Sequence, residues 1–268
     1  MLKQRIITAV WLAPLVLGGL FGLDGGAFAL FTAGIVLLGV WEWNNLAGIQ
    51  RTRHHMMLVG GAAIAMLLLW QSGAVLSRWP LWIAAAGWLV SLYWVMRYPE
   101  ALSQWCSTPR RLLMGACVLL PCWVGFNLLR ESGVVWLLFV VLLVWTADIG
   151  AYFAGRALGK RKLAPRVSPG KSWEGVLGGL AATLVLALLF SVWQDLGGYG
   201  GLVLLCVTLI VTLVSVLGDL LESMLKRYRG IKDASQLLPG HGGVLDRIDS
   251  LTAAVPVFAL LYPLVANV

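Results

Sequence analysis

The sequence predicts an all-α, polytopic integral membrane protein with about nine transmembrane helices, and three observations support this fold class. Of its 268 residues, 60% are hydrophobic and only 12% are charged, whereas soluble domains carry roughly 25% charged residues. Apolar segments that approach the roughly 20 residues needed to cross a bilayer recur along the chain. The basic residues gather on one side of the alternating topology, as is typical of membrane proteins.

The apolar segments give the order of the elements. They run roughly over 6–22, 26–47, 56–76, 79–96, 111–129, 133–154, 173–194, 199–225 and 248–267. Only Ser77 and Arg78 separate the third segment from the fourth, so a merged or re-entrant arrangement is an alternative there. We find no internal repeat and no low-complexity linker, so nothing marks off a soluble domain.

The distribution of positive charge predicts the orientation. With the N-terminus inside, 18 of the 20 Lys and Arg residues, Lys3 and Arg5 among them, lie on the inner side; Arg78 and Arg130 are the exceptions. Positive charge is not readily translocated. We therefore predict a multi-pass protein of the cell inner (cytoplasmic) membrane whose N-terminus and long basic loops, 155–172 and 226–247, are cytoplasmic. The net charge of +8 thus indicates topology and anionic phosphate ligands, not nucleic acid.

Two pairs of carboxylates flank the second basic loop. Asp219 and Glu222 stand three residues apart near the end of one apolar segment, and Asp246 and Asp249 do so near the start of the next. Residues three apart lie on one face of a helix. Such pairs, with Lys and Arg between them, suit a divalent metal and a phosphate. The alternative is a solvated loop whose acids cap helices.

A second polar group begins with Asp148, which lies inside an apolar run. An ionised carboxylate there is costly unless it is paired or faces water, so it is a candidate functional residue; bonding to a neighbouring helix is the alternative.

The following Ser-Pro-Gly-Lys-Ser run, 168–172, does not match a P-loop, because that motif needs Gly where the chain has Pro165 and a strand of an α/β sheet before it. We expect Ser172 or Ser168 to cap the next helix, where an anion is favoured.

A lone acid stands near the inner end of the second segment, where Glu42 lies between Trp41 and Trp43. An interfacial Trp-Glu-Trp run is more typical of a membrane anchor than of a reactive site. We therefore assign Glu42 no part in the site.

The C-terminal half resembles the phosphatidate cytidylyltransferase (CDP-diacylglycerol synthase) family. The resemblance is carried by Ser223-x2-Lys226-Arg227-x4-Lys232-Asp233-x5-Pro239-Gly240-His241-Gly242-Gly243-x2-Asp246-Arg247-x-Asp249. Asp148 with Ala151-Tyr152-Phe153 and Gly155-Arg156, and the block Ser168-Pro169-x-Lys171-Ser172-x-Glu174-Gly175, are also similar to segments of that family. The first 130 residues resemble the family only in being apolar spans.

The resemblance implies an enzyme that transfers a cytidylyl group from CTP to phosphatidic acid, giving CDP-diacylglycerol and pyrophosphate in phospholipid biosynthesis. It further implies a homodimer among membrane lipids and a catalytic region at 131–268. We group residues 1–130 as a scaffold of transmembrane helices, which could also supply the dimer contacts. Two alternatives stay open. The first is a membrane phosphotransferase that consumes a CDP-alcohol; its D-x-x-D-G-x-x-A-R pattern needs Gly where this chain has Ser250. The second is an ion-coupled transporter that uses intramembrane Asp residues, which would be expected to show repeats.

The site residues are assigned by chemistry. Mg²⁺ suits a site of oxygen donors and takes one or two carboxylates plus substrate phosphates; whether a second cation shares the site is left open. Its expected ligands are Asp219 and Asp246, with Asp249 and Asp148 as further ligands or supporting groups. The expected phosphate contacts are Lys171, Lys226, Arg227, Lys232 and Arg247, with hydroxyl donors Ser168, Ser172 and Ser223. Gly240, Gly242 and Gly243 would let the loop backbone approach the nucleotide, and His241 could touch phosphate, act as a base or hydrogen-bond the loop.

Overall fold

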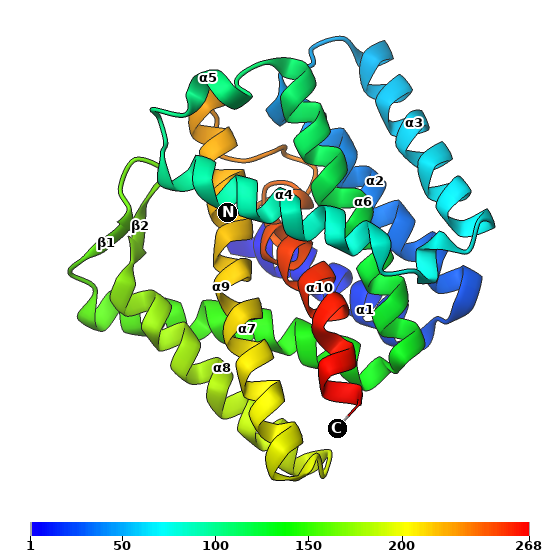
Figure 1. The fold of residues 1–268 in the computed structure, drawn as a ribbon. Coiled ribbons are helices and arrows are strands. Elements are labelled where there is room, and N and C mark those ends of the chain that lie inside the picture. Colours follow the sequence, from blue (N-terminus) through cyan, green and yellow to red (C-terminus); the bar gives the residue numbers. More distant parts are fainter. Residues whose placement is uncertain (1, 268) are drawn as a thin grey trace.

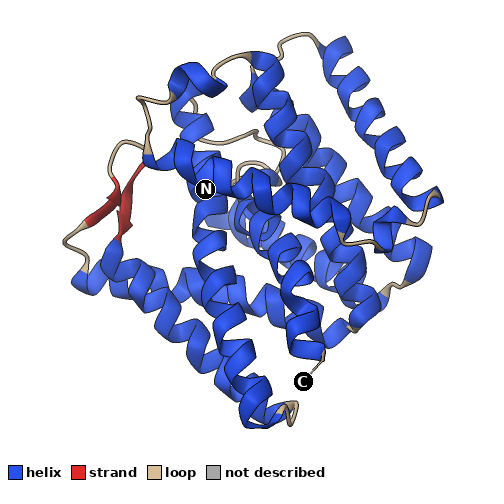
Figure 2. Ribbon diagram, viewed as in Figure 1, coloured by secondary structure: helices blue, strands red, loops and turns tan. Residues whose placement is uncertain are grey.

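The computed structural model describes the backbone of residues 2–267 and the side chains of residues 10–12 and 14–267. Helices make up most of this part of the chain (Figure 2), which confirms the predicted fold class. Within it, eight helices are long and apolar enough to cross a membrane. The first predicted segment corresponds to α1 (Leu2–Gly22); the side chains of Lys3 and Arg5, which entered the topology prediction, lie outside the described residues.

The helices follow the predicted segments with shifted ends. After α1 come α2 (Gly25–Ala47), α3 (Thr52–Gln71), η1 (Ala74–Leu76), α4 (Trp79–Met96), α5 (Leu102–Trp105), α6 (Thr108–Ser132), α7 (Val134–Leu158), α8 (Trp173–Trp193), α9 (Gly197–Arg229) and α10 (Leu245–Ala266). The third and fourth segments are separate helices joined by the 3₁₀ turn η1. In Figure 1, α3 lies at the edge of the molecule, and α9 runs along most of its length.

The end of α9 and the start of α10 differ from the prediction in a way that changes the site. Helix α9 continues past residue 225 because the Lys and Arg residues of its last turn are good helix formers and favour a helix C-terminus. It ends at Gly230, whose φ of 66° only glycine adopts readily; the Gly230 N–H donates to the carbonyl of Arg227 and the Ile231 N–H to that of Lys226. Helix α10 begins at Leu245. Lys226, Arg227 and Asp246 therefore lie on helices and not in the loop.

A short hairpin, which the sequence did not predict, precedes α8. Strand β1 (Lys162–Ala164) pairs antiparallel with β2 (Ser168–Ser172), and β2 leads directly into α8 (Figure 2). The missed strands contain Pro169 and Gly170, residue types that are depleted in sheets. An isolated hairpin is not the α/β sheet of a P-loop, so the rejection of that motif stands.

Small residues let the C-terminal helices approach closely. A Cβ on Gly150 of α7 would lie 2.8 Å from the carbonyl oxygen of Gly178 in α8. A Cβ on Gly218 of α9 would lie 2.5 Å from the carbonyl oxygen of Asp249 in α10. Glycines of this kind are common where membrane helices pack. The contact at Gly218 brings the two acid-bearing helix ends together.

Contacts far apart in the sequence join the predicted cytoplasmic ends of the helices. The buried Arg111 of α6 donates to the carbonyl of Ala47 at the end of α2, and its guanidinium lies 4.7 Å from the centre of the Tyr228 ring. The Tyr228 hydroxyl in turn donates to the carbonyl of Cys106. Helix α10 packs against α2, α4 and α6, so the N-terminal helices support the C-terminal ones. The division of the chain at residue 130 stays a prediction.

Candidate active site

Lys226 lies at the centre of the acid cluster formed by the ends of α9 and α10. Its Nζ is 2.8 Å from Glu222 Oε2 and 2.8 Å from Asp246 Oδ1. The exposed fractions of the three side chains are 15% for Lys226, 2% for Glu222 and 6% for Asp246. Without Lys226, the two buried acids would have no counter-charge, so both depend on this lysine.

Asp246 also closes the loop that precedes α10. Its Oδ2 accepts hydrogen bonds from the backbone N–H groups of Ala234, at 3.0 Å, and Gly243, at 2.7 Å. The carboxylate therefore joins the start of α10 to both ends of the loop and, through Lys226, to α9. This placement agrees with the predicted proximity of the two carboxylate pairs.

A second lysine reaches the cluster from the hairpin. Lys171 of β2 has its Nζ 2.7 Å from Asp219 Oδ2, and the Ser223 hydroxyl donates to Asp219 Oδ1 at 3.1 Å. Lys171 and Asp219 are 25% and 30% exposed, so this pair is more accessible than the Lys226 group. The structure thus brings the Ser-Pro-Gly-Lys-Ser run, 168–172, next to the carboxylate pairs of α9 and α10.

Asp148 and Lys171 line a cavity of about 200 Å³ between α7, α8, β2 and α9. The cavity also touches Gly155, Gly170 and Ser172. Ser172 caps α8, because its Oγ accepts a hydrogen bond from the N–H of Gly175 at 3.1 Å. This confirms the first of the two predicted caps, whereas Ser168 lies at the start of β2. The structure therefore places Asp148 beside the lysine that pairs with Asp219.

The other predicted phosphate contacts have different surroundings. Arg227 donates from Nε to the carbonyl of Val167 at 3.1 Å and so ties the hairpin to α9. Arg247 donates from Nε and Nη2 to the carbonyl of His241 at 3.0 and 2.6 Å. Lys232 lies exposed in the loop. Both arginines thus donate hydrogen bonds to backbone carbonyls, while their side chains remain largely exposed.

The glycines of the loop fall into two groups. Gly240 and Gly242 have φ values of 78° and 81°, which explains why glycine stands there. Gly243 is buried instead against the carboxyl group of Glu42, where a Cβ would lie 2.7 Å from either oxygen. His241 Nδ1 is buried without a hydrogen-bond partner among the described residues, and the His241 N–H donates to the carbonyl of Leu238.

Sequence reasoning missed two acids in this region. Glu42 is fully buried, so its interpretation as an interfacial anchor is wrong; Trp43 beside it is also buried and donates to the carbonyl of Arg111. Glu222 was recognised as the helical neighbour of Asp219 but was given no role. A lone acid at the end of an apolar helix was the available signal for Glu42, but its partner lies too far along the chain to be inferred.

The cluster contains more acidic than basic side chains, but it offers few ligands that could bind one divalent cation together. The cluster holds four carboxyl groups, those of Asp219, Glu222, Asp246 and Asp249, but only two lysines, Lys171 and Lys226. Glu222 Oε1 has no hydrogen-bond partner among the described residues. In that part of the chain no three His, Cys, Asp or Glu residues converge at metal-binding distance. A divalent ion held here would therefore take most of its ligands from water and substrate phosphates, as Mg²⁺ typically does.

Comparison with known proteins shows similarity over the whole chain. The model of the cytidylyltransferase family matches residues 3–265. The chain is 51% identical over 269 residues to a phosphatidate cytidylyltransferase of Pseudomonas aeruginosa, covering 97% of each protein. It is 42% identical to one of Haemophilus influenzae over 98% of this chain and 99% of that protein, and 39% identical to one of Brucella suis over 97% and 92%. The similarity includes the first 130 residues, where we found no shared motif.

Proposed function

The chain belongs to the cytidylyltransferase family, and we propose that it joins phosphatidic acid to CTP, giving CDP-diacylglycerol and pyrophosphate. The observation that carries this proposal is the cluster of two lysines among carboxylates where the hairpin, α9 and α10 meet. Similarity along the full chain favours this reaction over the phosphotransferase and transporter alternatives.

The reaction requires the chain to bring two polyanions together. A phosphate oxygen of the lipid attacks the α-phosphorus of CTP, the bond from that phosphorus to the β-phosphate oxygen breaks, and pyrophosphate leaves with the electron pair. The lipid phosphate is already anionic, so a general base has little to do. The chain's main contributions are therefore position and positive charge.

We assign these contributions to the residues of the cluster. Lys171 and Lys226 are held by their carboxylate partners and can turn toward phosphate oxygens. Arg227, Lys232 and Arg247 add charge around the loop, with Ser223 and Ser168 as hydroxyl donors. Mg²⁺, held by Asp219 and Asp246 with Asp249 and Asp148 nearby, would supply charge neutralisation of the triphosphate; a second cation stays a proposal of the same kind.

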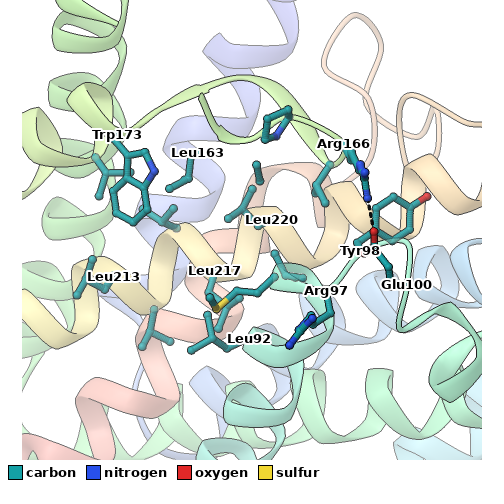
Figure 3. A pocket seen from close by; sticks show the side chains of 18 residues that line it. Leu92, Arg97, Tyr98, Glu100, Leu163, Arg166, Trp173, Leu213, Leu217 and Leu220 are labelled. Carbon is teal, nitrogen blue, oxygen red and sulfur yellow. Dashed lines mark hydrogen bonds and ion pairs between the residues drawn. The ribbon is translucent and has the colours of Figure 1, made fainter. Parts of the chain in front are cut away.

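An apolar cavity beside this cluster suits the acyl chains of the lipid. It measures about 740 Å³, a size typical of ligand sites, and lies between α4, the hairpin, α8 and α9. Figure 3 shows leucines such as Leu213 and Leu217 along its wall, while Arg97, Glu100 and Arg166 gather at one end. Arg166 and Glu100 form an ion pair there, and backbone hydrogen bonding together with Arg166 lowers the pKa of Glu100. Val176 and Val216 line both this cavity and the smaller one that holds Lys171.

Filling this cavity is expected to weaken lipid binding selectively. Leu213 lines the cavity and is 49% exposed, so Leu213→Trp can add bulk without a strained core. We expect the KM for long-chain phosphatidic acid to rise roughly tenfold while the KM for CTP stays unchanged. Leu209→Trp is the matched control, because Leu209 lies one turn earlier on α9 and outside the cavity. Equal KM values for the lipid in the two variants would exclude this cavity as the acyl site.

We further propose that the cluster faces the cytoplasm. The Arg166–Glu100 pair and the Tyr228–Cys106 hydrogen bond join segments predicted to be inside, whereas Arg130, predicted outside, donates to the carbonyl of Leu23. In a variant without its native cysteines, Lys162→Cys and Ser235→Cys should resist a membrane-impermeant thiol reagent in intact cells. Asp195→Cys, in the opposite loop, should react. Labelling of Lys162→Cys without permeabilisation would reverse the orientation.

The function itself is tested with purified protein in lipid or detergent. Phosphatidic acid, Mg²⁺ and each nucleoside triphosphate are supplied in turn, and both pyrophosphate and lipid-linked nucleotide are measured. CTP should give CDP-diacylglycerol. Folded protein that forms no lipid-linked cytidine at any Mg²⁺ concentration would refute the proposal. The homodimer also stays a proposal, to be checked by cross-linking and mass measurement.

A further inference from the structure

Glu42 of α2 binds a segment that lies about two hundred residues further along the chain. Its Oε1 accepts hydrogen bonds from the Ser235 hydroxyl at 2.5 Å and from the N–H of Val244 at 2.9 Å. Its Oε2 accepts from the N–H of Leu245 at 2.6 Å. The side chain is fully buried, so water does not compete for these donors. Both oxygens are therefore committed to the loop before α10 and to the first turn of that helix.

These bonds replace a cap that α10 lacks in its own sequence. The first N–H groups of a helix have no partner within it, and Val244, at the N-cap position, has no side chain that can accept a hydrogen bond. Glu42 accepts from two of these groups, and Asp246 accepts from the N–H of Gly243 just before them. An acid at this end of a helix is also favoured by the helix dipole.

The carboxyl group of Glu42 therefore fixes the place of Asp246. Leu245, which Glu42 holds, directly precedes Asp246, and Asp246 pairs with Lys226 of α9. We propose that Glu42 is a positioning residue, which acts through the first turn of α10 to hold Asp246 and the 230–244 loop against Lys226. The inference rests on the proposed function for its kinetic consequence, but the contact can be tested without it.

The arrangement requires a carboxylate and not merely a polar side chain. Three donors face the two oxygens of Glu42. In Glu42→Gln the shape is kept, but an NH₂ group must face at least one of these donors, and that buried donor loses its partner. The substitution thus loosens the start of α10 without opening a cavity.

The test combines kinetics with hydrogen exchange on the full-length protein. We expect Glu42→Gln to lower kcat about 10- to 100-fold, the range for residues that orient a metal or reactive group. The KM for CTP should rise as well, because Lys226 and the loop shift; a mere loss of folded enzyme would leave KM unchanged. Amide exchange should accelerate at Val244 and Leu245 and across 230–244, and stay unchanged in α6 and α7. Glu131→Gln, at an exposed glutamate of α6, is the matched control and should match the wild type in every measurement.

The exchange pattern of Glu42→Gln decides whether Glu42 positions the start of α10. Wild-type exchange at Val244 and Leu245 in Glu42→Gln would overturn the proposal whatever the activity, and faster exchange throughout the protein would show a general structural role instead. Faster exchange confined to the loop and α10 supports the contact even if the wild type transfers no cytidylyl group, in which case only the proposed function fails. Ser235→Ala, which removes one of the three hydrogen bonds, should show a smaller change in the same segment.

Discussion

Asp219→Asn and Asp246→Asn are each expected to lower turnover by several orders of magnitude while leaving the protein folded. Each amide keeps the shape of the carboxyl group but removes the charge proposed to hold an ion beside the triphosphate. Asp219 would lose its pairing with the partly exposed Lys171. The amide of Asp246→Asn can still turn its oxygen toward the N–H groups of Ala234 and Gly243, and Lys226 keeps Glu222.

The two substitutions should be strongly non-additive, because they act on one site. We expect the double variant to be hardly slower than either single variant, and the remaining activity to respond less to Mg²⁺. Asp195→Asn is the control: Asp195 lies exposed in the opposite loop with a φ of 52°, which asparagine tolerates. Near-normal turnover and an unchanged Mg²⁺ response in Asp219→Asn or Asp246→Asn would remove that residue from the metal site.

The sequence predicted the parts of the site that depend on local patterns. Long apolar segments predicted the helices because crossing a bilayer requires both length and apolar composition. The i, i+3 spacing predicted the acid pairs on α9 and α10, and the start of an apolar run predicted the cap at Ser172. The end of α9 was less predictable, because Gly230 stops the helix only after a polar turn that resembles a loop.

The parts that were missed depend on contacts across the fold. The pairing of Lys171 with Asp219 requires the hairpin, which forms by strand pairing from a run containing Pro and Gly. The role of Glu42 depends on α2 and α10 meeting at Gly243, where only a residue without Cβ fits beside the carboxyl group. Neither contact leaves a periodic signal in the sequence. Most residues of the cluster were therefore predictable from motifs, whereas their supporting framework was not.

Lys226→Met is expected to abolish turnover and to destabilise the fold as well, unlike the two aspartate substitutions. Methionine keeps most of the length of the side chain but removes the positive charge. Glu222 and Asp246 then face each other at exposed fractions of 2% and 6% without a counter-charge. Breaking a buried ion pair in this way typically costs about 3–5 kcal/mol. We expect that loss in the free energy of unfolding, measured in detergent, and no detectable CDP-diacylglycerol.

A second substitution separates the two effects. In Lys226→Met with Glu222→Gln, one of the buried negative charges is gone, so much of the lost stability should return. Turnover should not return, because the lysine proposed to contact phosphate is still absent. Lys232→Met is the control for charge alone: Lys232 is exposed in the loop, so stability should not change and activity should fall only modestly. Recovery of turnover in the double variant would show that Lys226 serves only to neutralise Glu222 and Asp246, and it would lose its assignment as a phosphate ligand.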